Sequence, residues 1–133
     1  MKEFYRILIP VMAIAVLFSF LFACTDSSSQ KEKEYTTEYK LAVIDKGGYL
    51  EEDDPIVSEY KIILDSLKSK VINEEMDIAD TVVKAQEVLR EKYQIYLSIL
   101  KIMKDLDASI PEDEENIDLV EVAAAYMVLL VSD

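Results

Sequence analysis

Apolar residues recur along residues 55–71 at intervals of three and four, the spacing that places side chains on one face of an α-helix. The repeat consists of Ile56, Val57, Tyr60, Ile63, Leu64, Leu67 and Val71. Asp54 suits the start of this helix because its carboxylate can accept hydrogen bonds from first-turn amides, and Pro55 fits the first helical position. This stretch is the clearest predicted helix in the chain.

Residues 37–45 have a mixed pattern. Apolar and polar residues alternate over part of the segment, which would also suit a strand, but no second strand is visible to pair with it. We therefore predict a short helix that ends at Gly47 and Gly48, where a positive φ angle costs little.

Residues 74–106 carry two apolar stripes that one straight helix could not present to the same core. The first is Ile78, Val82, Ala85, Leu89 and Tyr93, and the second is Ile95, Ile99, Ile102, Met103 and Leu106. At about 100° per residue, the stripes differ by roughly a third of a turn. We predict a break near Tyr93 and Gln94, with Asn73 as the N-cap of the first helix.

The last apolar segment, residues 117–131, follows an acidic connection at residues 107–118 and is apolar almost all the way round, with Glu121 its main exception. Helices of this kind are usually the central, most buried elements of a bundle, and we expect that placement here. The alternative is a docking helix whose second apolar face meets a partner or a second copy. The three alanines at 123–125 would permit close approach in either case.

The composition indicates one modest domain. The chain has 133 residues, 51% of them apolar, with two glycines and three prolines, which favours long helices over a turn-rich β-sandwich. We predict an all-α domain at residues 37–133, a small bundle of four to five helices. The net charge of −13 makes nucleic acid an unlikely partner, because phosphate binding needs a clustered basic surface. A basic protein partner or divalent cations are compatible with this charge.

Missing residue types exclude several kinds of chemistry. The chain has no histidine, and its only cysteine is Cys24. A Ser-His-Asp or Cys-His catalytic group, a Cys/His zinc cage and an internal disulfide are therefore excluded. We expect a protein that is not an enzyme, with no catalytic residues, no cofactor and no bound metal.

The N-terminus has the layout of a secretory signal. Lys2 and Arg6 give a positively charged start, and residues 7–23 are then apolar except for Pro10 and Ser19. The apolar run ends in Leu21, Phe22, Ala23 and Cys24, and a polar stretch rich in serine, lysine and glutamate follows.

This junction resembles the lipobox of bacterial lipoproteins, in which an aliphatic residue at −3 and a small residue at −1 precede the lipidated cysteine. Leu21 and Ala23 match that pattern, whereas Phe22 is larger than the residue usually found at −2. The resemblance implies a signal peptide at residues 1–23, a palmitate-bearing lipid on Cys24, and a location on the bacterial cell envelope outside the cytoplasm. Residues 24–36 would be a flexible polar tether. The alternative is an uncleaved transmembrane anchor.

Two acidic segments are candidate sites. Glu51, Glu52, Asp53 and Asp54 concentrate carboxylates beside a helix start, where capping explains them, although contact with a cation or a basic partner is the functional alternative. Asp105 begins a segment like the opening of an EF-hand loop, but Ile110 stands where the turn needs glycine.

These patterns favour a lipid-anchored, non-catalytic envelope protein that binds or scaffolds another envelope component, through residues 119–131 or the Glu51–Asp54 loop. The alternative is an acidic protein of the inhibitor or immunity type that neutralises a basic hydrolase or toxin.

Overall fold

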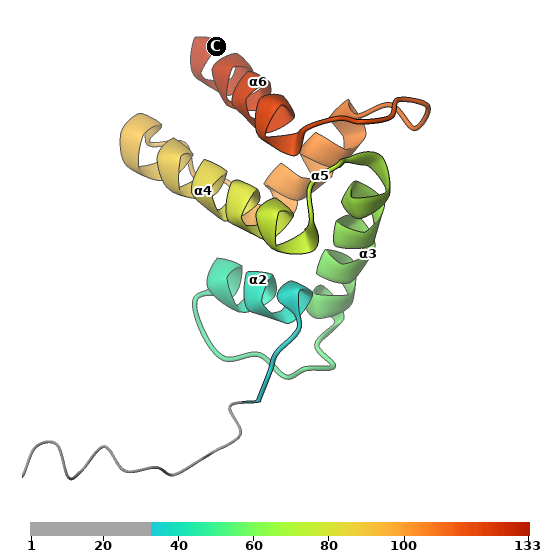
Figure 1. Ribbon diagram of the computed structural model, residues 1–133. Helices are drawn as coiled ribbons and strands as arrows, with labels where there is room; N and C mark the ends of the chain where they lie inside the picture. The colour runs from blue at the N-terminus through green and yellow to red at the C-terminus, as the bar shows by residue number, and fades with distance from the viewer. Residues whose placement is uncertain (1–32) are drawn as a thin grey trace, which may run out of the picture. The chain divides into compact units, whose positions relative to one another are not determined.

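The computed structural model describes residues 33–133, and within that range it contains five helices and no named strand. They are α2 (Thr37–Lys46), α3 (Pro55–Lys70), α4 (Glu75–Tyr93), α5 (Ile99–Ser109) and α6 (Leu119–Ser132) (Figure 1). The predicted all-α class and the small helical bundle are confirmed for this part of the chain. The predicted signal peptide and Cys24 lie outside the described residues. The helices and their core belong to one compact unit, Tyr35–Asp133.

The first two helix boundaries follow the predicted chemistry. Gly47 ends α2 in the left-handed conformation with φ 73°, and its amide donates to the Val43 carbonyl at 2.9 Å. At the start of α3, the Ile56 amide donates to Asp54 Oδ1 at 2.9 Å, and Pro55 occupies the first turn. The predicted caps at Gly47 and Asp54 are both confirmed.

The predicted break between α4 and α5 is also confirmed. Gln94 is left-handed with φ 58°, and the Ile95 amide donates back to the Leu89 carbonyl at 2.9 Å, which closes the end of α4. The chain restarts at Ser98, whose hydroxyl accepts from the Lys101 amide at 3.0 Å. The change of direction allows both apolar stripes to reach the same core.

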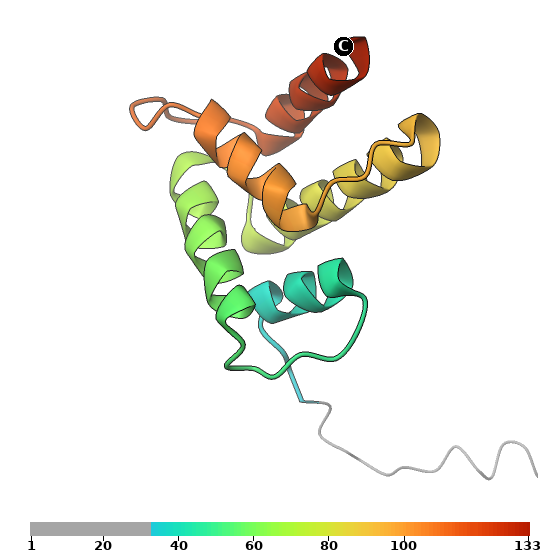
Figure 2. The same cartoon turned by 180° about the vertical axis from the view of Figure 1, so that it is seen from behind.

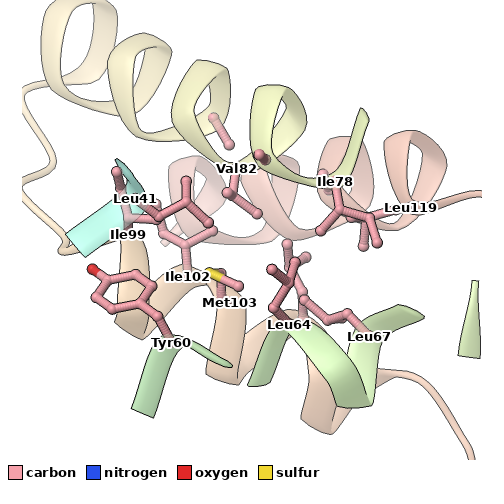
Figure 3. Packing of buried hydrophobic residues seen from close by; sticks show 14 of the residues in the cluster. Leu41, Tyr60, Leu64, Leu67, Ile78, Val82, Ile99, Ile102, Met103 and Leu119 are labelled. Atoms are coloured by element: carbon pink, nitrogen blue, oxygen red, sulfur yellow. The ribbon is translucent and has the colours of Figure 1, made fainter. Parts of the chain in front are cut away.

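The core lies around α4 and α5, each of which contacts the other four helices, whereas α6 contacts only α4 and α5. Figure 3 shows the side chains of α3, α4 and α5 meeting between the helices, with Met103 near the middle. The largest fully buried side chains are Leu41, Tyr60, Leu64, Leu67, Ile78, Val82, Leu89, Ile99, Ile102, Met103, Leu106 and Leu119. No charged side chain of the described residues is fully buried.

The predicted central position of the last helix is wrong. Only Leu119 and Ala123 of α6 are buried, whereas Val128 is 64% exposed and Leu129 is 70% exposed. The helix lies at the edge of the bundle in both views (Figures 1 and 2), so its two neighbours cover only one side of it. The central position belongs instead to α5, whose one-sided apolar stripe is fully buried.

The predicted role of Asn73 is also wrong, because this side chain serves α6 and not α4. Asn73 Oδ1 accepts from the Leu119 amide at 2.7 Å, and its Nδ2 donates to Asp118 Oδ1 at 3.1 Å. Beside it, the Ile72 amide donates to the Ile117 carbonyl at 2.9 Å. The N-cap of α4 is Glu74, which makes no side-chain capping bond. The α3–α4 connection therefore holds the start of α6 close to the start of α4.

Candidate functional site

The Glu51–Asp54 loop is exposed at its first three positions, and the hydrogen bonds of Glu51 and Asp54 are local. Asp54 caps α3, its amide donates to the Glu51 carbonyl at 3.1 Å, and the Tyr49 hydroxyl donates to Glu51 Oε2 at 3.3 Å. Among residues 33–133, no group of three or more carboxylates or other ligand side chains is placed to hold a metal ion. The geometry accounts for Asp54 as a helix cap, and Glu51, Glu52 and Asp53 form no metal-binding group within residues 33–133.

The carboxylates of the EF-hand-like segment lie in the last turns of α5 and form a hydrogen bond and ion pairs with nearby side chains. Asp105 Oδ2 accepts from the Tyr126 hydroxyl at 2.7 Å, and Asp105 also pairs with Lys101. Asp107 Oδ1 lies 3.1 Å from Lys70 Nζ. Partial burial raises the pKa of Asp105, but the hydrogen bonds from Lys101 and Tyr126 outweigh it and bring the pKa below its usual value. These acids link α5 to α6 and to α3.

Asp45, at the end of α2, joins three other helices and is a residue that the sequence pattern did not single out. Its Oδ1 accepts from the Ile99 amide at 2.9 Å and from Gln86 Nε2 at 3.1 Å, while Oδ2 accepts from the Tyr60 hydroxyl. Burial and this hydrogen bond raise the pKa of Tyr60. Both Asp45 oxygens bind protein donors, so this carboxylate holds the start of α5 against α2, α3 and α4. We call this set of hydrogen bonds the Asp45 latch.

A groove of about 380 Å³ lies between α4 and α6. The two helices run side by side in the same general direction in both views (Figures 1 and 2). The groove is lined by Asp80, Thr81, Lys84, Ala85 and Val88 of α4 and by Val120, Ala123, Ala124 and Met127 of α6. Its walls are mostly apolar, and small side chains at several positions keep it open.

The groove continues onto the exposed side of α6. Val120 is 53% exposed, Val128 is 64% exposed, and Ala124 is exposed as well. Projected at about 100° per residue, these side chains and Val131 lie within about 80° of one another, whereas Leu129 lies beyond Glu121 on the opposite side of the helix and outside this surface. An exposed apolar surface of this continuity is unusual on a domain that is otherwise rich in charge, and such surfaces commonly mark interaction sites. We call the groove and this exposed side together the α6 face.

A second hollow, of about 560 Å³, lies on the other side of α4, against α2. It is lined by Thr37, Lys40, Leu41, Ile44, Met76, Ala79, Asp80, Val83, Lys84 and Glu87. Asp80 and Lys84 border both hollows, so α4 forms a charged ridge between them. Four charged side chains border this second hollow, against two in the groove beside α6.

The sequence pattern had pointed to residues 119–131 as a possible docking helix. In the structure Val120, Val128 and Leu129 of this segment are exposed, whereas Leu119 and Ala123 are buried. It had not pointed to the α4 wall, because, of Thr81, Ala85 and Val88, only Ala85 belongs to the predicted apolar stripe, where it indicates a core position. No family model, no curated protein and no solved structure matches the chain. Within residues 33–133, none of the helices is long and apolar enough to cross a membrane.

Proposed function

We propose that the protein is a lipid-anchored binding protein of the bacterial cell envelope, in which Cys24 carries the lipid and the helical domain binds another envelope component through the α6 face. The observation that carries the binding role is the exposure of Val120 and Val128 beside an apolar groove. Leaving such side chains in water forgoes about 1.5–3 kcal/mol for each large one that could be buried, so a partner surface gains free energy by covering them.

The described polar groups support binding over catalysis. Asp45 and Asp105 accept hydrogen bonds from neighbouring helices, and Asp107 forms an ion pair with Lys70 of α3. None of the three lines either hollow. The chain also lacks histidine, the most common general acid and base.

Metabolic labelling tests the anchor. We expect Cys24→Ala to abolish incorporation of labelled palmitate and to leave the uncleaved precursor, because the lipobox pattern requires the thiol. Thr25→Ala, one residue further along, is the matched control and keeps the label. Labelling of the Cys24→Ala protein at the wild-type level would contradict a lipid on this residue.

Capture from envelope extract tests the binding role. The wild-type protein should enrich a partner that the Ala124→Glu variant does not, because a carboxylate at this exposed position enters the groove. Leu129→Glu, on the same helix but away from the groove lining, is the matched control for added charge. An envelope extract from which the wild type enriches nothing at any salt concentration would contradict the binding role.

The net charge of −13 favours a second candidate, an acidic inhibitor that neutralises a basic hydrolase or toxin. Such an inhibitor associates quickly and loses affinity steeply as salt is added, because its encounter is steered by charge. Inhibition of candidate basic envelope hydrolases at low salt is the measurement, and unchanged hydrolase activity would remove this candidate.

A further inference from the structure

Helix α6 is attached to the domain more firmly at its start than along the rest of its length. The α3–α4 connection fixes its first turn, because Asn73 Oδ1 accepts from the Leu119 amide at 2.7 Å and the Ile72 amide donates to the Ile117 carbonyl at 2.9 Å. The Leu119 side chain is fully buried. The start of α6 therefore has a fixed position beside the start of α4.

Burial decreases along α6 towards its end. Its buried residues, Leu119 and Ala123, lie within the first five positions, and the apolar side chains that follow are partly buried or exposed. In contrast, α4 has buried side chains throughout residues 78–89, and α5 throughout residues 99–106. Few buried contacts and an exposed surface are typical of elements that open locally, so the second half of α6 is weakly held by packing.

One hydrogen bond connects the second half of α6 to another helix of residues 33–133. The Tyr126 hydroxyl donates to Asp105 Oδ2 of α5 at 2.7 Å, and no ion pair within that range involves α6. Hinge motions turn on a few residues at the end of an element while the element itself stays intact. The fixed first turn and the single bond beyond it give α6 the arrangement of such a hinge.

A swing of α6 about its first turn would change the width of the groove between α4 and α6. The lining spans residues 81–88 of α4 and 120–127 of α6, about two turns of each helix. The helices run in the same general direction from starts that lie close together (Figures 1 and 2). Movement of the far end of α6 would therefore separate Met127 from Val88 more than Val120 from Thr81.

We propose that α6 is a hinged helix, fixed at Leu119 and held closed by the Tyr126–Asp105 hydrogen bond, and that its swing opens and closes the groove between α4 and α6. The inference goes beyond the proposed binding function, because it concerns the domain alone and requires neither a partner nor a lipid. Most of the largest fully buried side chains belong to α3, α4 and α5, so the core stays enclosed when α6 swings. Opening α6 therefore costs less free energy than unfolding the domain.

Native-state hydrogen exchange, measured for each amide by NMR, tests the swing because it detects openings that are rarely populated. A helix of 14 residues is only marginally stable without its packing, so the amides of an open α6 exchange. The protein is residues 24–133 with Cys24→Ser, which keeps the complete unit Tyr35–Asp133. In this protein we expect the amides of residues 127–131 to share one protection factor, lower than that of the α5 amides.

Two matched variants separate opening of α6 from unfolding of the domain. Tyr126→Phe and Tyr60→Phe each remove a tyrosine hydroxyl that donates to an aspartate. Only the Tyr126 bond breaks when α6 swings, so Tyr126→Phe should speed exchange at residues 127–131 by about fivefold or more, a change of about 1 kcal/mol. Tyr60→Phe should speed exchange in α5 and leave residues 127–131 unchanged.

Circular dichroism verifies that both variants are folded. Asp105→Ala, which removes the acceptor in place of the donor, repeats the test if Tyr126→Phe is unfolded. The inference is overturned by equal protection of residues 127–131 and α5, by equal acceleration of both segments in Tyr60→Phe, or by unchanged exchange of residues 127–131 in Tyr126→Phe.

Fraying of the chain end would give a different pattern from a hinge. Protection would then decline residue by residue towards Ser132 in place of one shared value, and this result would also overturn the inference. Failure of the proposed function is a separate result, the absence of any partner from envelope extract, and it leaves the exchange measurement unaffected.

Discussion

Replacing Asp45 with alanine removes the acceptor for donors on three other helices. The Ile99 amide and the Tyr60 hydroxyl belong to fully buried residues, and both donate to this carboxylate. Gln86 keeps a second partner, the Leu97 carbonyl at 2.9 Å, and is affected less. The variant therefore leaves two buried donors without an acceptor and loosens the contact between α2 and the start of α5.

The magnitude follows from those two donors. A buried donor left without a partner costs about 1–3 kcal/mol, so the loss of an acceptor for two donors in Asp45→Ala should lower the free energy of unfolding by about 2–6 kcal/mol. For a domain of this size, that is a large part of a total of about 5–15 kcal/mol. Tyr60→Phe removes one donor and leaves Asp45 its amide partners, so it should cost about 1 kcal/mol. The double variant should lose less unfolding free energy than the two single variants lose together, because both single changes remove the same Tyr60–Asp45 hydrogen bond.

Urea unfolding followed by circular dichroism measures these differences. Asp65→Ala is the matched control, because it removes the same charge from an exposed residue that, among residues 33–133, pairs only with Lys61 one turn away. Exposed pairs of this kind contribute about 0.3–0.5 kcal/mol. If Asp45→Ala costs no more than Asp65→Ala, the latch does not stabilise the fold and the reasoning is refuted.

Two further predictions concern stability. Asn73→Ala should cost about 1–3 kcal/mol and increase amide hydrogen exchange in α6 more than in α5, because the buried Leu119 amide loses its acceptor; Glu74→Ala, which removes no capping bond, should change little. Burial and carboxylate contacts raise the pKa of both Tyr60 and Tyr126 above 10. The stability that these two hydroxyls give the fold is therefore fully present below pH 10 and is lost as the pH rises above it. Urea unfolding at a series of alkaline pH values should show stability falling above pH 10, less steeply in the Tyr60→Phe and Tyr126→Phe variants, and an unchanged slope would contradict this.

Local signals were sufficient for most of the helix boundaries. Asp54, Gly47 and the phase change at Gln94 act through neighbours within one or two turns, so their roles follow from sequence spacing. Asn73 and Asp45 act on residues more than forty positions away, at Leu119 and Ile99 respectively. Nothing in a linear pattern distinguishes a polar residue that caps its own helix from one that caps another, and the prediction for Asn73 was wrong for that reason.

Only the α6 side of the groove between α4 and α6 could be predicted from the sequence. The apolar character of residues 119–131 indicated a second apolar surface, but the same character also favoured the bundle centre, and only the placement of α6 at the edge separates the two. The α4 wall is composed of Thr81, Ala85 and Val88, and of these only Ala85 belonged to the predicted core stripe. A groove between two helices depends on the angle at which they meet, which the pattern within either helix does not encode.

The exposed side of α6 has no role in holding the domain together, since Val128 and Leu129 lie in water while α4 and α5 already enclose the core. A groove two helical turns long is also small beside a standard protein interface, which buries about 1,200–2,000 Å² in total. Contact through the groove alone would therefore be weak. A lipid on Cys24 would offset that weakness, because two proteins held at one membrane meet at a high effective concentration and even a weak contact is then occupied. On this argument the binding role in the cell depends on the lipid: releasing the domain from the membrane should reduce partner capture sharply.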